Sequence, residues 1–153
     1  MVLNGCVMNH PRNPHIKNGL VAKGLLRASL HPSAFISRVL FLLTGCDIGR
    51  PLPSTTFLPH PQGIVVGSYV QLGNHVVIGH QVTLGGRDFD IKNMPVIEDG
   101  VYLGAGAKVL GQLKIGAGAT IGANSVVTRD VPAGAVVVGA NRILHGKTSA
   151  YAF

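Results

Sequence analysis

A six-residue repeat constrains the fold of this chain more than any other feature of its sequence. In the stretch IGAGATIGANSVV, residues 115–127, an aliphatic residue stands at every sixth position and is followed by Gly or another small residue. An apolar or small residue also stands two positions before each of these aliphatic residues. A helix would repeat every 3.6 residues and would be destabilised by so many Gly, so the period of six argues against helices here.

The repeat runs from residue 64 in two phases that are separated by the stretch RDFDIKNMPV. The aliphatic positions of the first phase are Val66, Leu72, Ile78 and Leu84, and those of the second, shifted by one residue, are Ile97, Leu103, Val109, Ile115, Ile121 and Val127. Side chains two positions apart on a β-strand point to the same side, and Gly suits the tight corner that follows. Three such faces would close one coil, and stacked coils would share one core. The sequence therefore predicts an all-β solenoid.

The residues before the repeat predict a short helical segment. Residues 1–16 are expected to form an extended arm, and Asn18 is expected to cap a helix over 19–30. A second helix is expected to start near Ser33 and to end at Gly45. The apolar stripes of the two helices would be Leu20, Val21, Leu25 and Leu26 in the first and Phe35, Val39, Leu40, Leu42 and Leu43 in the second. We expect the helices to cover one end of the stacked coils.

Composition narrows the class of partner. The formal net charge is +7, but Lys and Arg are scattered and aromatic residues are few, so we expect no nucleic-acid partner. A phosphorylated cofactor, an anionic glycan carrier or a merely solvated surface would suit the charge equally well. The apolar stretch SAFISRVLFLLTGC is too short to span a bilayer and contains Arg38, so no membrane insertion is expected. Cys6 and Cys46 match no metal or redox spacing, which favours a reduced, cytoplasmic setting.

Residues 46–147 resemble the hexapeptide-repeat acyltransferases, and within them the serine acetyltransferase-like branch. The blocks that carry the resemblance are HPQGIVVG, QVTLGG, GAGAKVLG, IGAGATIGANSVV and VPAGAVVVGANRI. The resemblance implies a left-handed parallel β-helix, usually a homotrimer with active sites between subunits, and acetyl-CoA as donor. The left hand rests on the resemblance alone, because parallel crossovers otherwise favour the right hand. The chain would then divide into an arm and helical cap at 1–45, the β-helix at 46–147 with a loop at 87–95, and a tail at 148–153.

The resemblance also assigns a catalytic base. His60 stands where the family has the His that takes the proton from the acceptor hydroxyl, a task that suits an imidazole at neutral pH. Asp47 stands near the place of the carboxylate that orients this imidazole, although its interval to His60 is shorter than usual. Two structural alternatives remain open: a His60 packed inward, in line with the six-residue count, and an Asp47 that caps a helix or a turn.

The family's donor groove runs between neighbouring β-helices, and small residues line it where the backbone approaches the cofactor. Gly86, Ala105 and Ala123 match those positions. Arg142 and Lys147 match the basic residues near the cofactor phosphates, or else belong to a basic tail. A backbone amide near Gly86 is a candidate to stabilise the oxyanion.

The acceptor region departs from the serine acetyltransferases. Their loop ends in Arg-His, which holds the substrate carboxylate, whereas Asn93 and Met94 stand here. The acidic residue usually found before the catalytic His is replaced by Pro59. These changes favour the relatives that acetylate saccharide hydroxyls. We therefore expect an acetyl-CoA-dependent O-acetyltransferase that acts on a small or saccharide acceptor by direct transfer.

Three alternatives stay open. A truncated serine O-acetyltransferase would use L-serine despite Asn93 and Met94. A zinc protein like the hexapeptide-repeat carbonic anhydrases would use His75 and His80, but the two occupy different points of the repeat and no third ligand follows, so no metal is expected. A scaffold that has lost catalysis would not bind CoA.

Overall fold

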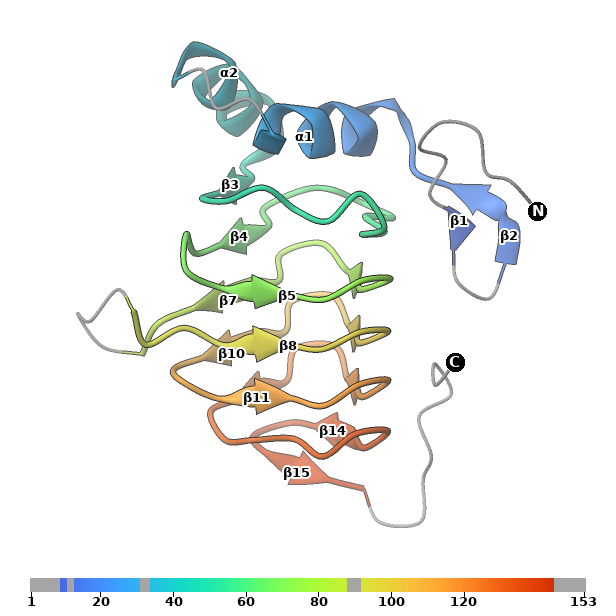
Figure 1. Cartoon of the computed structure of the whole chain (residues 1–153), viewed down its shortest axis with the longest axis vertical. Helices are drawn as coiled ribbons and strands as arrows, with labels where there is room; N and C mark the ends of the chain where they lie inside the picture. Colours follow the sequence, from blue (N-terminus) through green and yellow to red (C-terminus); the bar gives the residue numbers. More distant parts are fainter. Residues whose placement is uncertain (1–8, 11–12, 31–33, 88–91, 145–153) are drawn as a thin grey trace.

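The computed structural model describes residues 9–10, 13–30, 34–87 and 92–144. Its N-terminal part holds the antiparallel strands β1 (Asn9–His10) and β2 (Asn13–Lys17), followed by helices α1 (Leu20–Leu30) and α2 (Ala34–Thr44). Both predicted helices are confirmed, with ends close to those expected. Figure 1 shows α1 lying across one end of a stack of coils and α2 beyond it.

The remainder of the described chain consists of short strands arranged in three sheets. The first has the order β13-β10-β7-β4-β3, the second β11-β8-β5 and the third β15-β14-β12-β9-β6. All pairs are parallel except β14 with β15. The strands are β3 (Asp47–Ile48), β4 (Val65–Val66), β5 (Gln71–Leu72), β6 (Val77–Ile78), β7 (Thr83–Gly85), β8 (Val96–Ile97), β9 (Tyr102–Leu103), β10 (Lys108–Leu110), β11 (Lys114–Ile115), β12 (Thr120–Ile121), β13 (Val126–Val127), β14 (Val136–Val138) and β15 (Arg142–Ile143).

The register confirms that three hexads make one coil. Val65 pairs with Thr83, a step of 18 residues, and Thr83 pairs with Lys108, a step of 25 residues that includes the predicted loop. Lys108 pairs with Val126, again 18 residues on. The loop thus adds seven residues, one more than a hexad, which explains the one-residue shift of the repeat. The left hand of the β-helix stays a prediction from the resemblance.

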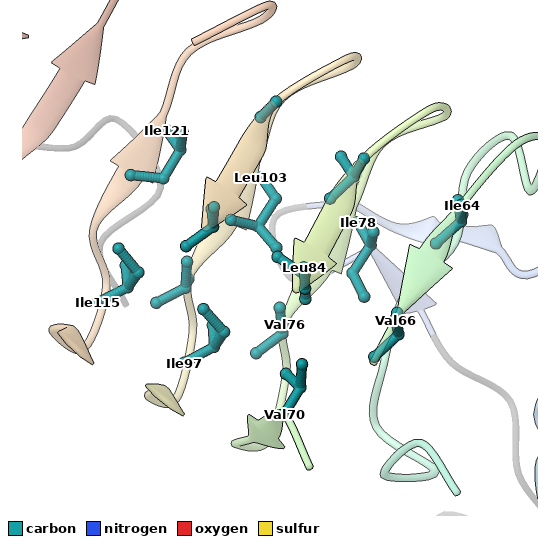
Figure 2. Close-up of a cluster of buried hydrophobic side chains, with 14 of the residues drawn as sticks. Ile64, Val66, Val70, Val76, Ile78, Leu84, Ile97, Leu103, Ile115 and Ile121 are labelled. Atoms are coloured by element: carbon teal, nitrogen blue, oxygen red, sulfur yellow. The ribbon is translucent and has the colours of Figure 1, made fainter. Parts of the chain in front are cut away.

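The repeat positions form one continuous core (Figure 2). The side chains of both marked positions of each hexad point inward, and most are completely buried: Ile64, Val66, Val70, Val76, Ile78, Val82, Leu84, Val101, Leu103, Ala107, Val109, Ile115, Ala119, Ile121 and Val127. Because strand neighbours of one column come from successive coils, like side chains stack on like side chains, as Figure 2 shows for Ile78 and Leu103.

Helix α1 closes the end of this core. Ala22, Leu25 and Leu26 are buried and join the core cluster. Asn18 does not cap the helix as predicted: its side chain is buried and bonds to the first coil, donating from Nδ2 to Thr56 O (3.0 Å) and accepting from Leu58 N (2.9 Å). These two bonds fix the end of the stack against the start of α1.

The predicted apolar stripe of the first helix is partly wrong, because Leu20 and Val21 lie exposed on the opposite side of α1 from Leu25 and Leu26. Phe35, Val39, Leu42 and Leu43 of α2 are exposed as well. No helix within the described ranges is long and apolar enough to cross a membrane.

Candidate functional site

His60 lies in the first coil, where the six-residue pattern fails. Pro59 and Pro61 flank it, and a proline fixes its own backbone and restricts the residue before it to extended conformations. Phe57 and Leu58 just before it are buried, and Phe57 bridges in parallel to Val77 of β6. The His60 side chain is exposed, so the alternative in which it packs into the core is wrong.

A second imidazole faces His60. The ring centroids of His60 and His80 lie 6.3 Å apart, with the ring planes at 71°, an edge-to-face arrangement. Neither ring makes a side-chain hydrogen bond to another described residue, so the ring nitrogens are free to meet a hydroxyl group. The sequence raised His80 only as a metal ligand. Its 18-residue step from Gln62, two positions after His60, was the signal that places it in the next coil below.

Asp47 belongs to β3, on the outer surface of the first sheet. It pairs in register with Val65 of β4, and its side chain is exposed. No hydrogen bond or ion pair joins its carboxylate to His60 among the described residues. The pairing of the two side chains therefore stays a prediction.

His80 shares one corner of the coils with the two predicted groove alanines. We call the positions Gln62–Gly63, His80–Gln81, Ala105–Gly106 and Ala123–Asn124 the histidine corner. Backbone bonds connect its successive levels: Gln81 N donates to Gln62 O, Gly106 N to His80 O and Asn124 N to Ala105 O, each at 2.8 Å. The second residue of each level has positive φ, which Gly and Asn adopt readily.

The histidine corner is smooth below His80 because it carries only small side chains there. A Cβ on Gly79 would lie 2.7 Å from Ala105 N, and a Cβ on Gly104 would lie 2.6 Å from Ala123 N. These Gly residues thus let the coils stack closely. Ala105 is half-buried and Ala123 is exposed, so a ligand could approach the backbone along this corner as predicted for the cofactor groove.

Gly86 lies on a different corner, which we call the loop corner: Gly67–Ser68, Gly86–Arg87 and Gly111–Gln112. The register of β4, β7 and β10 stacks these pairs. In Figure 1 the loop that follows Arg87 projects from this corner of the stack. The predicted groove residues Gly86, Ala105 and Ala123 are therefore not contiguous within one chain.

The end of the loop packs against the stack. A Cβ on Gly67 would lie 3.0 Å from Met94 Sδ, so the thioether occupies the space that the missing side chain leaves. Met94 is half-buried and contacts the core cluster, and Asn93 beside it is half-buried. Met94 thus has a packing role, which the sequence did not reveal.

The remaining candidates lie elsewhere. Arg142 is exposed on β15, which turns back antiparallel to β14 and pairs Val138 with Arg142. Lys147 lies outside the described residues. His75 occupies a third corner with φ 56° and donates its backbone N–H to Thr55 Oγ1 (3.0 Å), so it lies apart from His80. Within the described ranges no group of three or more His, Cys, Asp or Glu could hold a metal ion.

Comparisons with known proteins agree with this arrangement. Residues 94–129 match the family described as bacterial transferase hexapeptide (six repeats). The serine acetyltransferase of Mycobacterium tuberculosis is 48% identical over 101 residues, which are 64% of this chain and 44% of that protein. That of Helicobacter pylori strain J99 is 41% identical over 108 residues, 69% of this chain and 63% of that protein.

Solved structures give the same result. Serine acetyltransferase from Neisseria gonorrhoeae superposes with a TM-score of 0.72 at 36% identity, over 81% of this chain and 51% of that one. The soybean enzyme complexed with serine gives a TM-score of 0.63 at 38% identity, over 80% and 53%. These matches confirm the resemblance to the hexapeptide-repeat, serine acetyltransferase-like branch. The chain spans 35% to 63% of the length of the curated relatives it matches.

Proposed function

We propose that this chain is an acetyl-CoA-dependent O-acetyltransferase with His60 as its general base. The observation that carries the proposal is the position of His60, exposed beside His80 at the top of the corner that bears Ala105 and Ala123. The similarity to serine acetyltransferases covers this region and supports the donor.

The chemistry follows from an imidazole in this place. His60 takes the proton from an acceptor hydroxyl as its oxygen attacks the thioester carbonyl, which forms a tetrahedral oxyanion. The carbon–sulfur bond then breaks, the acetyl group stays on the acceptor oxygen, and the imidazolium returns the proton to the departing CoA thiolate. A backbone amide near Gly86 is our candidate donor to the oxyanion. Asp47 is our candidate for orienting the His60 imidazolium, a contact that would have to form in the assembled enzyme.

We infer that the complete site needs a second copy of the chain. His60 belongs to the histidine corner and Gly86 to the loop corner, and the two corners bound opposite ends of the first sheet. A homotrimer would bring the histidine corner of one subunit against the loop corner of the next, with acetyl-CoA between them. Arg142 and Lys147 are our candidates for contacts to the CoA phosphates.

Two acceptors are supported by different observations. L-serine is favoured by the comparisons, since the matched relatives are named serine acetyltransferases. A saccharide hydroxyl is favoured by the loop, because Asn93 and Met94 cannot supply the charged donors that a carboxylate binds, and Met94 is packed against Gly67. Pro59, beside His60, offers no charge to an amino group.

The test follows CoA release from acetyl-CoA with L-serine, amino sugars, neutral sugars and nucleotide sugars as acceptors. Acceptor-dependent release that His60→Ala abolishes would support the proposal, and the preferred acceptor would decide between serine and saccharide. A chain that binds no CoA in calorimetric titration would instead be a scaffold without catalysis.

A further inference from the structure

The two N-terminal helices expose an unusual amount of apolar surface. Leu20 is 87% exposed, Phe35 77%, Leu42 81% and Leu43 77%. Most of the large apolar side chains exposed on the described part of the chain lie on these helices: Leu20, Val21, Phe35, Val39, Phe41, Leu42 and Leu43. Exposed apolar residues gathered in one region, unlike isolated ones, indicate an interaction surface.

On α2 the exposed residues follow the helical period. Phe35, Val39, Leu42 and Leu43 are spaced i, i+4, i+7 and i+8, which places them on one face of the helix. Arg38 is exposed three residues after Phe35 and four before Leu42, so it borders the same stripe. On α1, Arg27 is exposed as well, on the side away from the buried Leu25 and Leu26.

The charge around this surface has one sign. Residues 1–46 contain five cations and no Asp or Glu, whereas all six acidic residues of the chain lie from Asp47 onward. The five cations are Arg12, Lys17, Lys23, Arg27 and Arg38. This segment thus accounts for five of the seven net positive charges.

We propose that α1 and α2 form a docking surface for an anionic phospholipid membrane, on which the helices lie in the plane of the headgroups. An apolar stripe bordered by Lys and Arg is the pattern of interfacial helices, whose apolar side enters the acyl boundary while the cations meet anionic lipids. At 11 residues each, the helices are too short to cross the bilayer. A second copy of the same surface fits less well, because it would bring cations against cations with no carboxylate between them.

The position of the helices suits such a surface. They lie at one end of the coil stack, and α2 lies beyond α1 on the side away from the strands (Figure 1). A flat bilayer could therefore approach this end without contact with the far coils. Because Leu25, Leu26 and Asn18 hold α1 to the stack, the docked helices would hold the β-helix at the membrane.

The experiment is flotation of the full chain with vesicles of equal parts phosphatidylcholine and phosphatidylglycerol, beside vesicles of phosphatidylcholine alone. We expect at least about fivefold more protein with the anionic vesicles, declining with added salt. Phe35→Ser/Leu42→Ser should lose most of the binding, whereas Tyr69→Ser, which removes a half-exposed aromatic ring from the β-helix, should retain it.

A charge-matched pair makes the test specific to the helices. Arg38→Glu and Arg129→Glu change the net charge equally, but Arg129 lies exposed on a far coil. Only Arg38→Glu should reduce flotation, by several-fold. Absence of flotation, or equal loss in both variants, would overturn the proposal. So would a wild-type assembly that sedimentation shows to be larger than that of Phe35→Ser/Leu42→Ser, because copies of the chain would then cover the face. Circular dichroism checks that each variant is folded, and Arg38→Glu carries the test if the double variant is not.

Discussion

The regular coils from Ile64 to Val138 and the first coil from Cys46 to Gly63 belong to the same stack but differ in what determines their side chains. In the regular coils each inward residue meets its counterpart one coil away, and nearly all are buried. The first coil contains four prolines and leaves His60 exposed between two of them. The repeat thus provides stability, whereas the interruption of the repeat provides chemistry, and substitutions in the two regions should separate the two properties.

The strongest test of this separation is His60→Ala. Loss of a general base should lower turnover by at least about 10²-fold, measured as acceptor-dependent CoA release, while the unfolding midpoint stays within error because the side chain is exposed. His75→Asn is the matched control: His75 is exposed on another corner, and Asn tolerates its positive φ. Near-normal turnover of His60→Ala would exclude the proposed mechanism.

The converse test is Leu103→Ala in the regular coils. Leu103 is fully buried between Ile78 and Ile121, so the cavity should lower the free energy of unfolding by about 3 kcal/mol. Turnover of the folded variant should change little. Denaturant unfolding at fixed protein concentration measures the effect, and Val126→Ala, at a 39% exposed position of β13, should cost less than about 0.5 kcal/mol. Equal losses in both variants would contradict the comparison.

The regular coils were predictable from the sequence, and the site was predictable only in part. Every hexad carries the same constraint, so the period gave the inward positions, and the phase shift gave the seven-residue insertion at the loop. No period covers the first coil, so the contact of His60 with His80 required the register of the folded chain. The helices were predicted from local signals, but which of their faces packs depends on the stack, and Leu20 and Val21 were therefore misplaced.

A mixing experiment tests whether the site is divided between the two corners of neighbouring chains. His60→Ala disables the histidine corner, and Gly86→Trp should fill the loop corner, so each variant alone should be inactive. In trimers reassembled from equal amounts of both, about one quarter of the sites should combine two intact corners. The control mixes His60→Ala with the double variant His60→Ala/Gly86→Trp, which should show no recovery. A mixture no more active than its components would place the site within one chain.

The loop should determine the acceptor. Asn93→Arg/Met94→His restores the residues that bind the substrate carboxylate in the resembled serine acetyltransferases, and one charge-assisted hydrogen bond should raise kcat/KM for L-serine about tenfold. Asn93→Gln/Met94→Leu keeps the packing against Gly67 without adding charge, and should leave kcat/KM unchanged. If the wild type already uses L-serine better than any saccharide, the missing Arg-His pair does not exclude serine and the saccharide acceptor is wrong.

The smallest effect is expected from the Glu98–Lys114 ion pair on the surface of the regular coils. The Lys114 ammonium, 2.6 Å from the carboxylate, lowers the pKa of Glu98 from its ordinary value of 4.5, and the Ala117 N–H adds a second bond at 2.8 Å. A lowered pKa stabilises the fold above 4.5, and this contribution disappears as pH falls through the lower value of the folded state. Glu98 likewise raises the pKa of Lys114 above 10.5, so the contribution of Lys114 disappears only as pH rises above 10.5. Glu98→Gln should therefore lower the thermal midpoint at about pH 7 by roughly 1 °C, and by less below about pH 4 or in high salt, because exposed charges are screened. A larger loss that persists in salt would mean that surface charge, and not the buried columns alone, stabilises the regular coils.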